Sequence, residues 1–95
     1  MAKYEVMFII NPTLDDEKKN QTVETVKEII AADGEVGEVE TIGMKKLAYP
    51  IEKLEEGYYV VVKFNGNPTL PKELDRRLRI SDNVMRHIIV NLEEN

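Results

Sequence analysis

Ser81 and His87 are the residues of this sequence that most resemble a nucleophile and its base. They are the chain's one serine and one histidine, and the chain has no cysteine. Nucleophilic catalysis needs a hydroxyl or thiol beside a base. Ser81 lies in a turn-forming run, where a serine usually hydrogen-bonds its own backbone. A lone histidine in a strand is more often packed than catalytic. We therefore predict no catalytic residue and no enzyme activity.

Two acidic clusters are the candidates for a metal site. Asp15-Asp16-Glu17 and Glu55-Glu56 lack the ligand spacing and the glycine of a calcium loop. A helix amino terminus explains the first cluster and a solvated turn explains the second. The chain also lacks the cysteines of a zinc site and a glycine motif that would hold phosphate. We predict no metal, no cofactor and no small-molecule substrate.

The charge distribution bears on nucleic-acid binding. The net charge of −5 argues against a protein that coats nucleic acid through its overall field. All the arginines nevertheless fall in one carboxy-terminal span. A charge run is most often only a solvated face. The arginines are Arg76, Arg77, Arg79 and Arg86.

The aromatic residues do not reproduce the glycine-aromatic pattern of RNA-recognition domains. Core packing is therefore predicted for most of the rings, and Tyr4 and Tyr49 are the expected surface exceptions.

The spacing of apolar residues along the chain predicts the helices and strands that position these residues. A strand over 3–10 precedes a helix over 14–32, for which Thr13 is the expected cap and Gly34 the expected left-handed stop. Two strands follow, over 35–47 and 57–64, joined by a polar loop at 53–56. A short helix begins after Thr69, with Pro71 in its first turn. The turn 81–83 then leads into a last strand.

The order strand, helix, strand, strand, helix, strand predicts an α+β, ferredoxin-like split βαβ fold. Both helices should cover one face of a four-stranded antiparallel sheet, with the first and third strands central. The other face is left uncovered. The strand over 35–47 mixes charges with glycines, which is typical of an edge strand with bulges.

The length of 95 residues and the 42% hydrophobic content predict a single domain over residues 1–95. Without cysteines, an apolar signal segment or a run long enough to span a bilayer, we expect an intracellular protein.

With these residues in view, the whole chain resembles the bacterial small-subunit ribosomal protein six family. The order and spacing of six short segments make the resemblance specific, and together they span nearly the full length. The segments are Tyr4-Glu5, Asn11-Pro12, Gly34, Leu47-Ala48-Tyr49-Pro50-Ile51, Gly57-Tyr58 and 78–86.

The resemblance implies a structural, cytoplasmic component of the small ribosomal subunit. It also implies that the chain pairs with small-subunit ribosomal protein eighteen and binds the central domain of small-subunit (16S) rRNA as that pair. A basic partner would supply the positive charge that this acidic chain lacks. The competing hypothesis is a small regulatory domain of the same fold that binds a metabolite between subunits, which predicts a ligand pocket.

We expect Lys3, Arg79 and Arg86 to carry most of the RNA contact, with Tyr4 as a neighbour, and to meet near one rim of the sheet. The alternative is that the arginines only pair with local carboxylates such as Asp75 and Asp82. That alternative applies most to Arg76 and Arg77.

We also expect part of the partner-docking surface to lie on the edge strand over 35–47. Charges of both signs flank Val39, Ile42 and Met44 there, so a partner can be steered by charge and held by the apolar residues. Charged side chains on an edge strand also prevent it from pairing with other chains, and this role alone would explain these charges. The resemblance points to three of these charged positions, Glu40, Lys45 and Lys46, as contacts with the partner or the nearby rRNA. The charged residues are Glu38, Glu40, Lys45 and Lys46.

Overall fold

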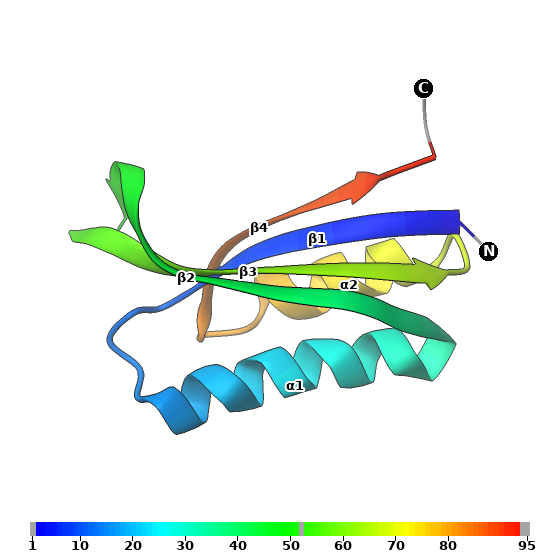
Figure 1. Ribbon diagram of the computed structural model, residues 1–95, viewed down its shortest axis with the longest axis horizontal. Coiled ribbons are helices and arrows are strands. Elements are labelled where there is room, and N and C mark those ends of the chain that lie inside the picture. Colours follow the sequence, from blue (N-terminus) through cyan, green and yellow to red (C-terminus); the bar gives the residue numbers. More distant parts are fainter. Residues whose placement is uncertain (1, 52, 94–95) are drawn as a thin grey trace.

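The computed structural model describes residues 2–51 and 53–93. Its elements are β1 (Ala2–Ile10), α1 (Asp16–Asp33), β2 (Gly34–Ile51), β3 (Leu54–Gly66), α2 (Leu70–Arg79) and β4 (Val84–Asn91). They form one four-stranded antiparallel sheet in the order β2-β3-β1-β4. Both helices lie on the same side of it (Figure 1). The predicted ferredoxin-like fold, with β1 and β3 central, is confirmed. No helix in the described residues is long and apolar enough to cross a membrane.

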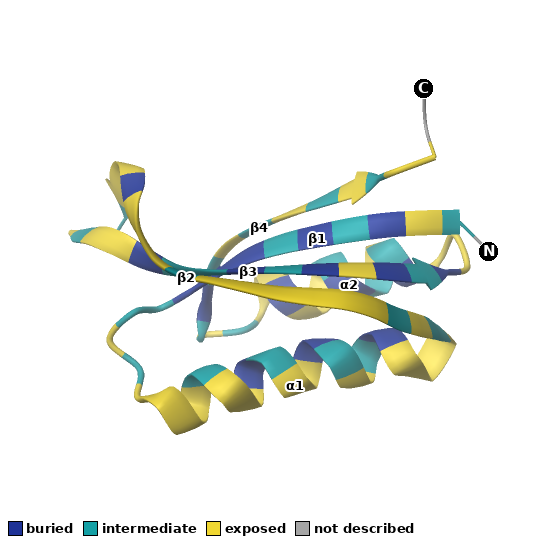
Figure 2. Cartoon of the chain, in the orientation of Figure 1, coloured by how far each residue is buried: buried dark blue, intermediate teal, exposed yellow. Residues whose placement is uncertain are grey.

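The core lies between the helices and one face of the sheet, where the buried positions alternate along β1 and β3 (Figure 2). Phe8 is fully buried between Val60 of β3 and His87 of β4, which oppose it in the neighbouring strands. Complete burial of such a side chain contributes about 1.5–3 kcal/mol. The helices close the core with a stripe of residues at helical spacing. These are Val26 and Ile30 of α1 and Leu70, Leu74 and Leu78 of α2.

Both ends of α1 differ from the prediction. The N-cap is Asp15, whose Oδ1 accepts from the Lys18 amide at 2.8 Å, and its carboxylate also suits the helix dipole. Thr13 instead donates its amide and hydroxyl to Asn11 Oδ1. Gly34 is not left-handed, since its φ of −169° is extended. A glycine is needed there because a Cβ atom would lie 2.1 Å from the Asn65 carbonyl oxygen.

Strand β2 is irregular, as an edge strand with bulges was predicted to be. Its register against β3 shifts between Val36 and Val39 and again between Thr41 and Gly43, where Gly43 has a φ of 93°. Beyond the pairing of Ile10 with Tyr58, β2 and β3 continue without β1. They form a two-stranded ribbon that curls away from the sheet (Figure 1). The predicted polar loop at 53–56 is therefore shorter, because β3 already begins at Leu54.

Candidate nucleic-acid and partner interface

Arg79 and Arg86 meet at the junction of α2 and β4. Arg79 is the last residue of α2, and Arg86 follows the short turn that leads into β4. Both line a shallow pocket of about 330 Å³, together with Leu78 and His87. In the described part of the chain Arg86 forms no ion pair, and its side chain is exposed. Arg86 opposes Ile9 and also lines a hollow with Met7 and Ile88, so it lies on the sheet face away from the helices, whereas Arg79 pairs with Asp75 on the helix side. Arginines on both sides of this corner suit the phosphates of a nucleic acid, whose oxygens accept their hydrogen bonds in a fixed geometry.

Lys3 does not join this pair. It lies at the start of β1, whereas Arg86 opposes Ile9 at the other end of the same strand. At about 3.3 Å per residue the two positions are about 20 Å apart. The Lys3 amide donates to Glu93 Oε1 at 2.8 Å and its carbonyl accepts from the Leu92 amide. The expectation that the three cations meet at one rim is therefore wrong, because antiparallel pairing sets the start of β4 beside the end of β1.

Tyr4 is not a surface residue either. Its side chain is 7% exposed, and its ring stacks on Phe64 with the centroids 5.4 Å apart. Tyr4 shares the alternation that turns Val6 and Phe8 toward the helices, so its ring belongs to the core. The prediction for Tyr49 is confirmed, since that residue is 82% exposed on the β2–β3 ribbon.

The other two arginines of α2 pair within the helix. Arg76 Nη2 lies 2.6 Å from Glu73 Oε1, and Arg77 Nη1 lies 4.0 Å from the same oxygen. Local pairing, the alternative considered for the arginines, is thus present for Arg76 and Arg77 with Glu73 and for Arg79 with Asp75. The hydrogen bond from Arg76 holds the pKa of Glu73 below its usual value and raises the pKa of Arg76.

Asp75 connects α2 with β4. Its Oδ1 lies 2.6 Å from His87 Nε2, and its Oδ2 lies 2.9 Å from Arg79 Nη2. The hydrogen bond from His87, followed by the charge of Arg79, lowers the pKa of Asp75 against the opposing effect of desolvation. His87 is thus packed and hydrogen-bonded, while Ser81 Oγ accepts from the Asn83 amide in its own turn at 3.3 Å.

These depressed carboxyl pKa values predict a pH-dependent stability. Asp75 and Glu73 titrate below the unfolded values of about 3.9 and 4.3. Their contribution is therefore present above those values and is lost as the pH falls through the lower, folded ones. Urea unfolding should show that Asp75→Asn with Glu73→Gln destabilises the protein more at about pH 7 than at about pH 2. About 1 M salt should shrink the difference, because exposed pairs are screened. An identical loss at both pH values would contradict this assignment.

The predicted docking residues divide into two groups along β2. Glu40 opposes Val61 of β3, and Glu38 lies 3.7 Å from Lys63 of β3, so both flank the sheet. Lys45 and Lys46 oppose Gly57 and Glu56 on the ribbon beyond it. All four predicted residues are exposed. The outer edge of β2 has no partner strand in the described chain, so its backbone groups are free to pair.

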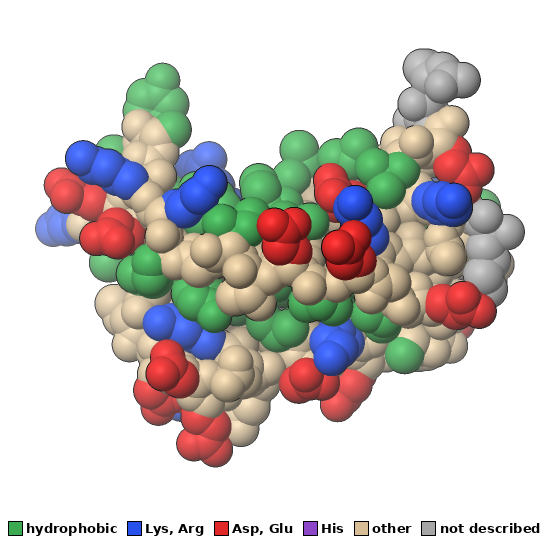
Figure 3. Space-filling model, viewed as in Figure 1, with side chains coloured by type: hydrophobic (Ala, Val, Ile, Leu, Met, Phe, Trp, Pro, Cys, Tyr) green, Lys and Arg blue, Asp and Glu red, His purple; other side chains and the backbone are tan. Residues whose placement is uncertain are grey.

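The sheet face away from the helices carries a row of exposed apolar residues. One cross-strand row runs from Val61 through Met7 to Ile88, and Val90 lies beside it on β4. Ile88 is 53% exposed and Val90 43%. Figure 3 shows hydrophobic side chains gathered on this side, with charged groups around them. The sequence indicates this face, because apolar residues occupy both odd and even positions of β4. Successive side chains of a strand point to opposite faces, so one of these two sets faces away from the helices. Exposed apolar patches rimmed by polar residues are typical of interaction surfaces, so this face is a candidate partner surface.

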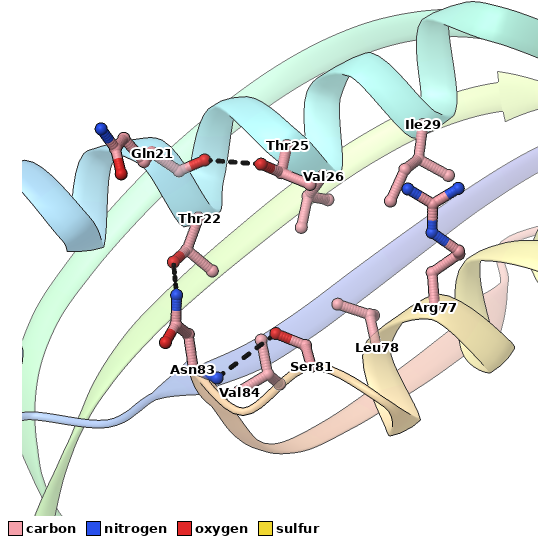
Figure 4. Close-up of a pocket in the computed structure, with 10 residues that line it drawn as sticks. All are labelled: Gln21, Thr22, Thr25, Val26, Ile29, Arg77, Leu78, Ser81, Asn83 and Val84. Carbon is pink, nitrogen blue, oxygen red and sulfur yellow. Dashed lines mark hydrogen bonds between the residues drawn. The ribbon is translucent and has the colours of Figure 1, made fainter.

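The metabolite hypothesis predicts a ligand pocket, and the hollow between α1 and the α2–β4 turn has its buried polar groups already paired (Figure 4). The hollow measures about 230 Å³. Asn83 Nδ2 donates to Thr22 Oγ1 at 3.2 Å, and that hydroxyl donates to the Lys18 carbonyl at 2.8 Å. Within the described residues no buried side-chain polar atom lacks a partner. The buried polar groups of Thr22 and Asn83 therefore already bind one another.

The fold is that of a small ferredoxin-like protein, with two arginines near the α2–β4 turn and exposed apolar residues on the open face of the sheet. No group of three or more acidic, histidine or cysteine side chains in the described chain is placed to hold a metal ion. A family model described as ribosomal protein S6 matches residues 3–91. The chain therefore belongs to the ribosomal protein S6 family, a structural protein of the small ribosomal subunit and so of the bacterial cytoplasm.

Individual relatives agree with the family match. The chain is 52% identical to small ribosomal subunit protein bS6 of Clostridium acetobutylicum over 95 residues, 99% of this chain and 100% of that protein. It is 48% identical to bS6 of Clostridioides difficile over 90 residues, 95% of this chain and 98% of that protein. The crystal structure of 30S ribosomal protein S6 from Thermotoga maritima superposes with a TM-score of 0.90 at 36% identity. That match covers 95% of this chain and 86% of the other.

Proposed function

We propose that this chain, acting as one domain, binds the central domain of 16S rRNA as a heterodimer with small-subunit ribosomal protein eighteen and performs no catalysis. The observation that carries the proposal is that two kinds of surface adjoin at one corner of the sheet. The apolar sheet face with its free edge suits a protein, and the two arginines at the α2–β4 turn, with Arg86 on the rim of that face, suit phosphate. A chain of net charge −5 is a poor RNA ligand alone, so a basic partner completes the positive surface.

The partner surface consists of the open face and the adjoining β2 edge. Glu40 continues the row formed by Val61, Met7 and Ile88, so a charge borders the apolar strip directly. Charges at such a rim steer the approach of a partner, while the desolvated centre supplies the affinity. Lys45 and Lys46 extend this surface along the ribbon toward the partner or the nearby rRNA.

The RNA surface is centred on Arg79 and Arg86. Lys3, at the far end of β1, makes a separate contact, so the RNA backbone has to pass both ends of the sheet. Tyr4 contributes by packing on Phe64 rather than by stacking on a base, since its ring is buried.

The proposal is tested by mixing the purified chain with ribosomal protein eighteen and with a central-domain fragment of 16S rRNA. Co-elution of the two proteins, and a mobility shift of the RNA by the pair but by neither protein alone, are the expected results. A shift by the isolated chain, or failure of the proteins to co-elute, would overturn the heterodimer. Stabilisation of the isolated chain by a metabolite would favour the regulatory alternative.

Arg79→Ala and Arg86→Ala should each weaken the binding of the pair to RNA. Each should also reduce the slope of log affinity against log salt by about one, because each removes a phosphate contact. Filter binding at several salt concentrations measures both quantities. Arg76→Ala is the matched control, since Arg76, like Arg79, pairs with a carboxylate of α2 but lies outside the pocket. Unchanged affinity and slope in the double variant would remove both arginines from the RNA interface.

A further inference from the structure

Asp75 is the carboxylate that α2 shares with the sheet. We propose that Asp75 is a positioning residue, which holds the Arg79 guanidinium at the α2–β4 pocket while His87 holds Asp75. This inference rests on the proposed RNA contact of Arg79 and adds to it the residues that prepare that contact.

His87 provides the fixed end of the arrangement. It lies in β4 opposite the fully buried Phe8, and its side chain is 13% exposed, so packing restricts the ring to one orientation. The ring donates from Nε2 to Asp75 Oδ1 at 2.6 Å. One oxygen of the carboxylate is thereby tied to the sheet, and the other is presented toward the end of α2.

Arg79 is the residue whose side chain this arrangement orders. Its side chain is 72% exposed, and its described ion pair is the one with Asp75 Oδ2 at 2.9 Å. An exposed arginine loses rotamer freedom when it binds a ligand, at a cost of about 0.5–1.5 kcal/mol, and ordering it beforehand avoids part of that cost. Asp75 therefore orders the Arg79 side chain before RNA binds, at the pocket that Arg79 and Arg86 both line.

The neighbouring pair on α2 shows that this arrangement is specific. Glu73 binds Arg76 and Arg77 within the helix, and in the described chain no group of β4 contacts its carboxylate. An exposed pair of that kind contributes little to stability and fixes nothing outside its helix. Asp75 differs because its second partner belongs to a different element.

The charge and the position of Asp75 have opposite effects on RNA binding, and this makes the proposal testable. Removing a negative charge beside an RNA site should strengthen binding through the field alone. Removing a support for Arg79 should weaken it. Asp75→Asn keeps the size of the side chain and combines both changes.

The matched control is Asp82→Asn, which removes the same charge from the turn between α2 and β4. Asp82 is exposed and forms no ion pair with any described residue. In the complex with ribosomal protein eighteen, we expect Asp82→Asn to leave the affinity for the 16S central-domain fragment unchanged or higher. We expect Asp75→Asn to lower it about threefold to tenfold. His87→Gln, which retains an N–H donor, should stay near wild type, and His87→Leu should resemble Asp75→Asn.

A second measurement keeps the test independent of RNA. The Nε–Hε NMR signal of Arg79 in the free protein should report an ordered side chain in the wild type and a mobile one in Asp75→Asn. Equal affinities of Asp75→Asn and Asp82→Asn, or an Arg79 signal that does not change, would overturn the positioning role. If Arg79→Ala itself has no effect on RNA binding, the proposed RNA contact fails. If Arg79→Ala weakens binding while the two aspartate variants agree, only the positioning role fails.

Discussion

Replacing Phe8 by alanine should lower the free energy of unfolding by about 3–5 kcal/mol. The Phe8 ring is fully buried at the centre of the sheet, with Val60 on one side and His87 on the other. The substitution removes the transfer free energy of the ring and leaves a cavity that strands paired on both sides cannot close. A domain of this size has about 5–15 kcal/mol of stability in total.

Urea unfolding at neutral pH measures this effect, and Tyr49→Ala is the matched control. It also deletes an aromatic ring from a strand, but the Tyr49 side chain is 82% exposed. The control should change the free energy of unfolding by no more than about 0.5 kcal/mol. If the two variants were equally stable, the packing of β1 between β3 and β4 would be wrong.

The element order and the central strands could be predicted because they depend on periodicities that burial enforces. The run from Val6 to Ile10 is continuously apolar, which is typical of a strand in the middle of a sheet, and Leu70, Leu74 and Leu78 repeat at helical spacing. Local capping was less predictable. Thr13 and Asp15 are both acceptable caps by type, and only the fold decides which of them precedes the first helical turn.

The candidate site was predictable where one short turn brings its residues together. Arg79 and Arg86 flank the turn 81–83, so their proximity follows from chain continuity. The distance from Lys3 to Arg86 follows instead from the antiparallel pairing of β1 with β4, which puts the start of one strand beside the end of the other. That pairing was part of the predicted sheet, so the predicted topology already argued against a meeting of the two residues. The Asp75–His87 contact likewise required the packing of α2 on β4.

The β2 edge shows how the same residues serve folding and recognition. A free edge exposes unpaired amides and carbonyls, which invite pairing with another chain unless charges and bulges interfere. The register shifts and the left-handed Gly43 supply the bulges, and the exposed glutamates and lysines supply the charges. Val39, Ile42 and Met44 remain 36%, 38% and 48% exposed between these charges, which leaves apolar surface that a matched partner can cover.

Reversing Glu40 and Lys46 together should weaken pairing with ribosomal protein eighteen about tenfold or more, because complementary charges across an interface become like charges. Net charge is unchanged, and each exposed charge contributes at most about 1 kcal/mol to folding. Isothermal titration of the two proteins and urea unfolding separate these effects. The matched control reverses Glu24 and Lys27, an exposed pair 3.2 Å apart on α1, and should pair normally.

Replacing Glu40 and Lys46 by valine instead should promote self-association, because the edge then combines free backbone groups with a continuous apolar strip. Glu40 adjoins the open-face row through Val61, so the substitution joins the edge to the exposed face in one apolar surface. Sedimentation velocity over a range of concentrations measures the association, and restoring Lys46 alone should reduce it. If the charge-reversed protein pairs normally and the valine variant stays monomeric at high concentration, β2 is neither the docking edge nor a guarded one, and the partner surface must lie on the open face without it.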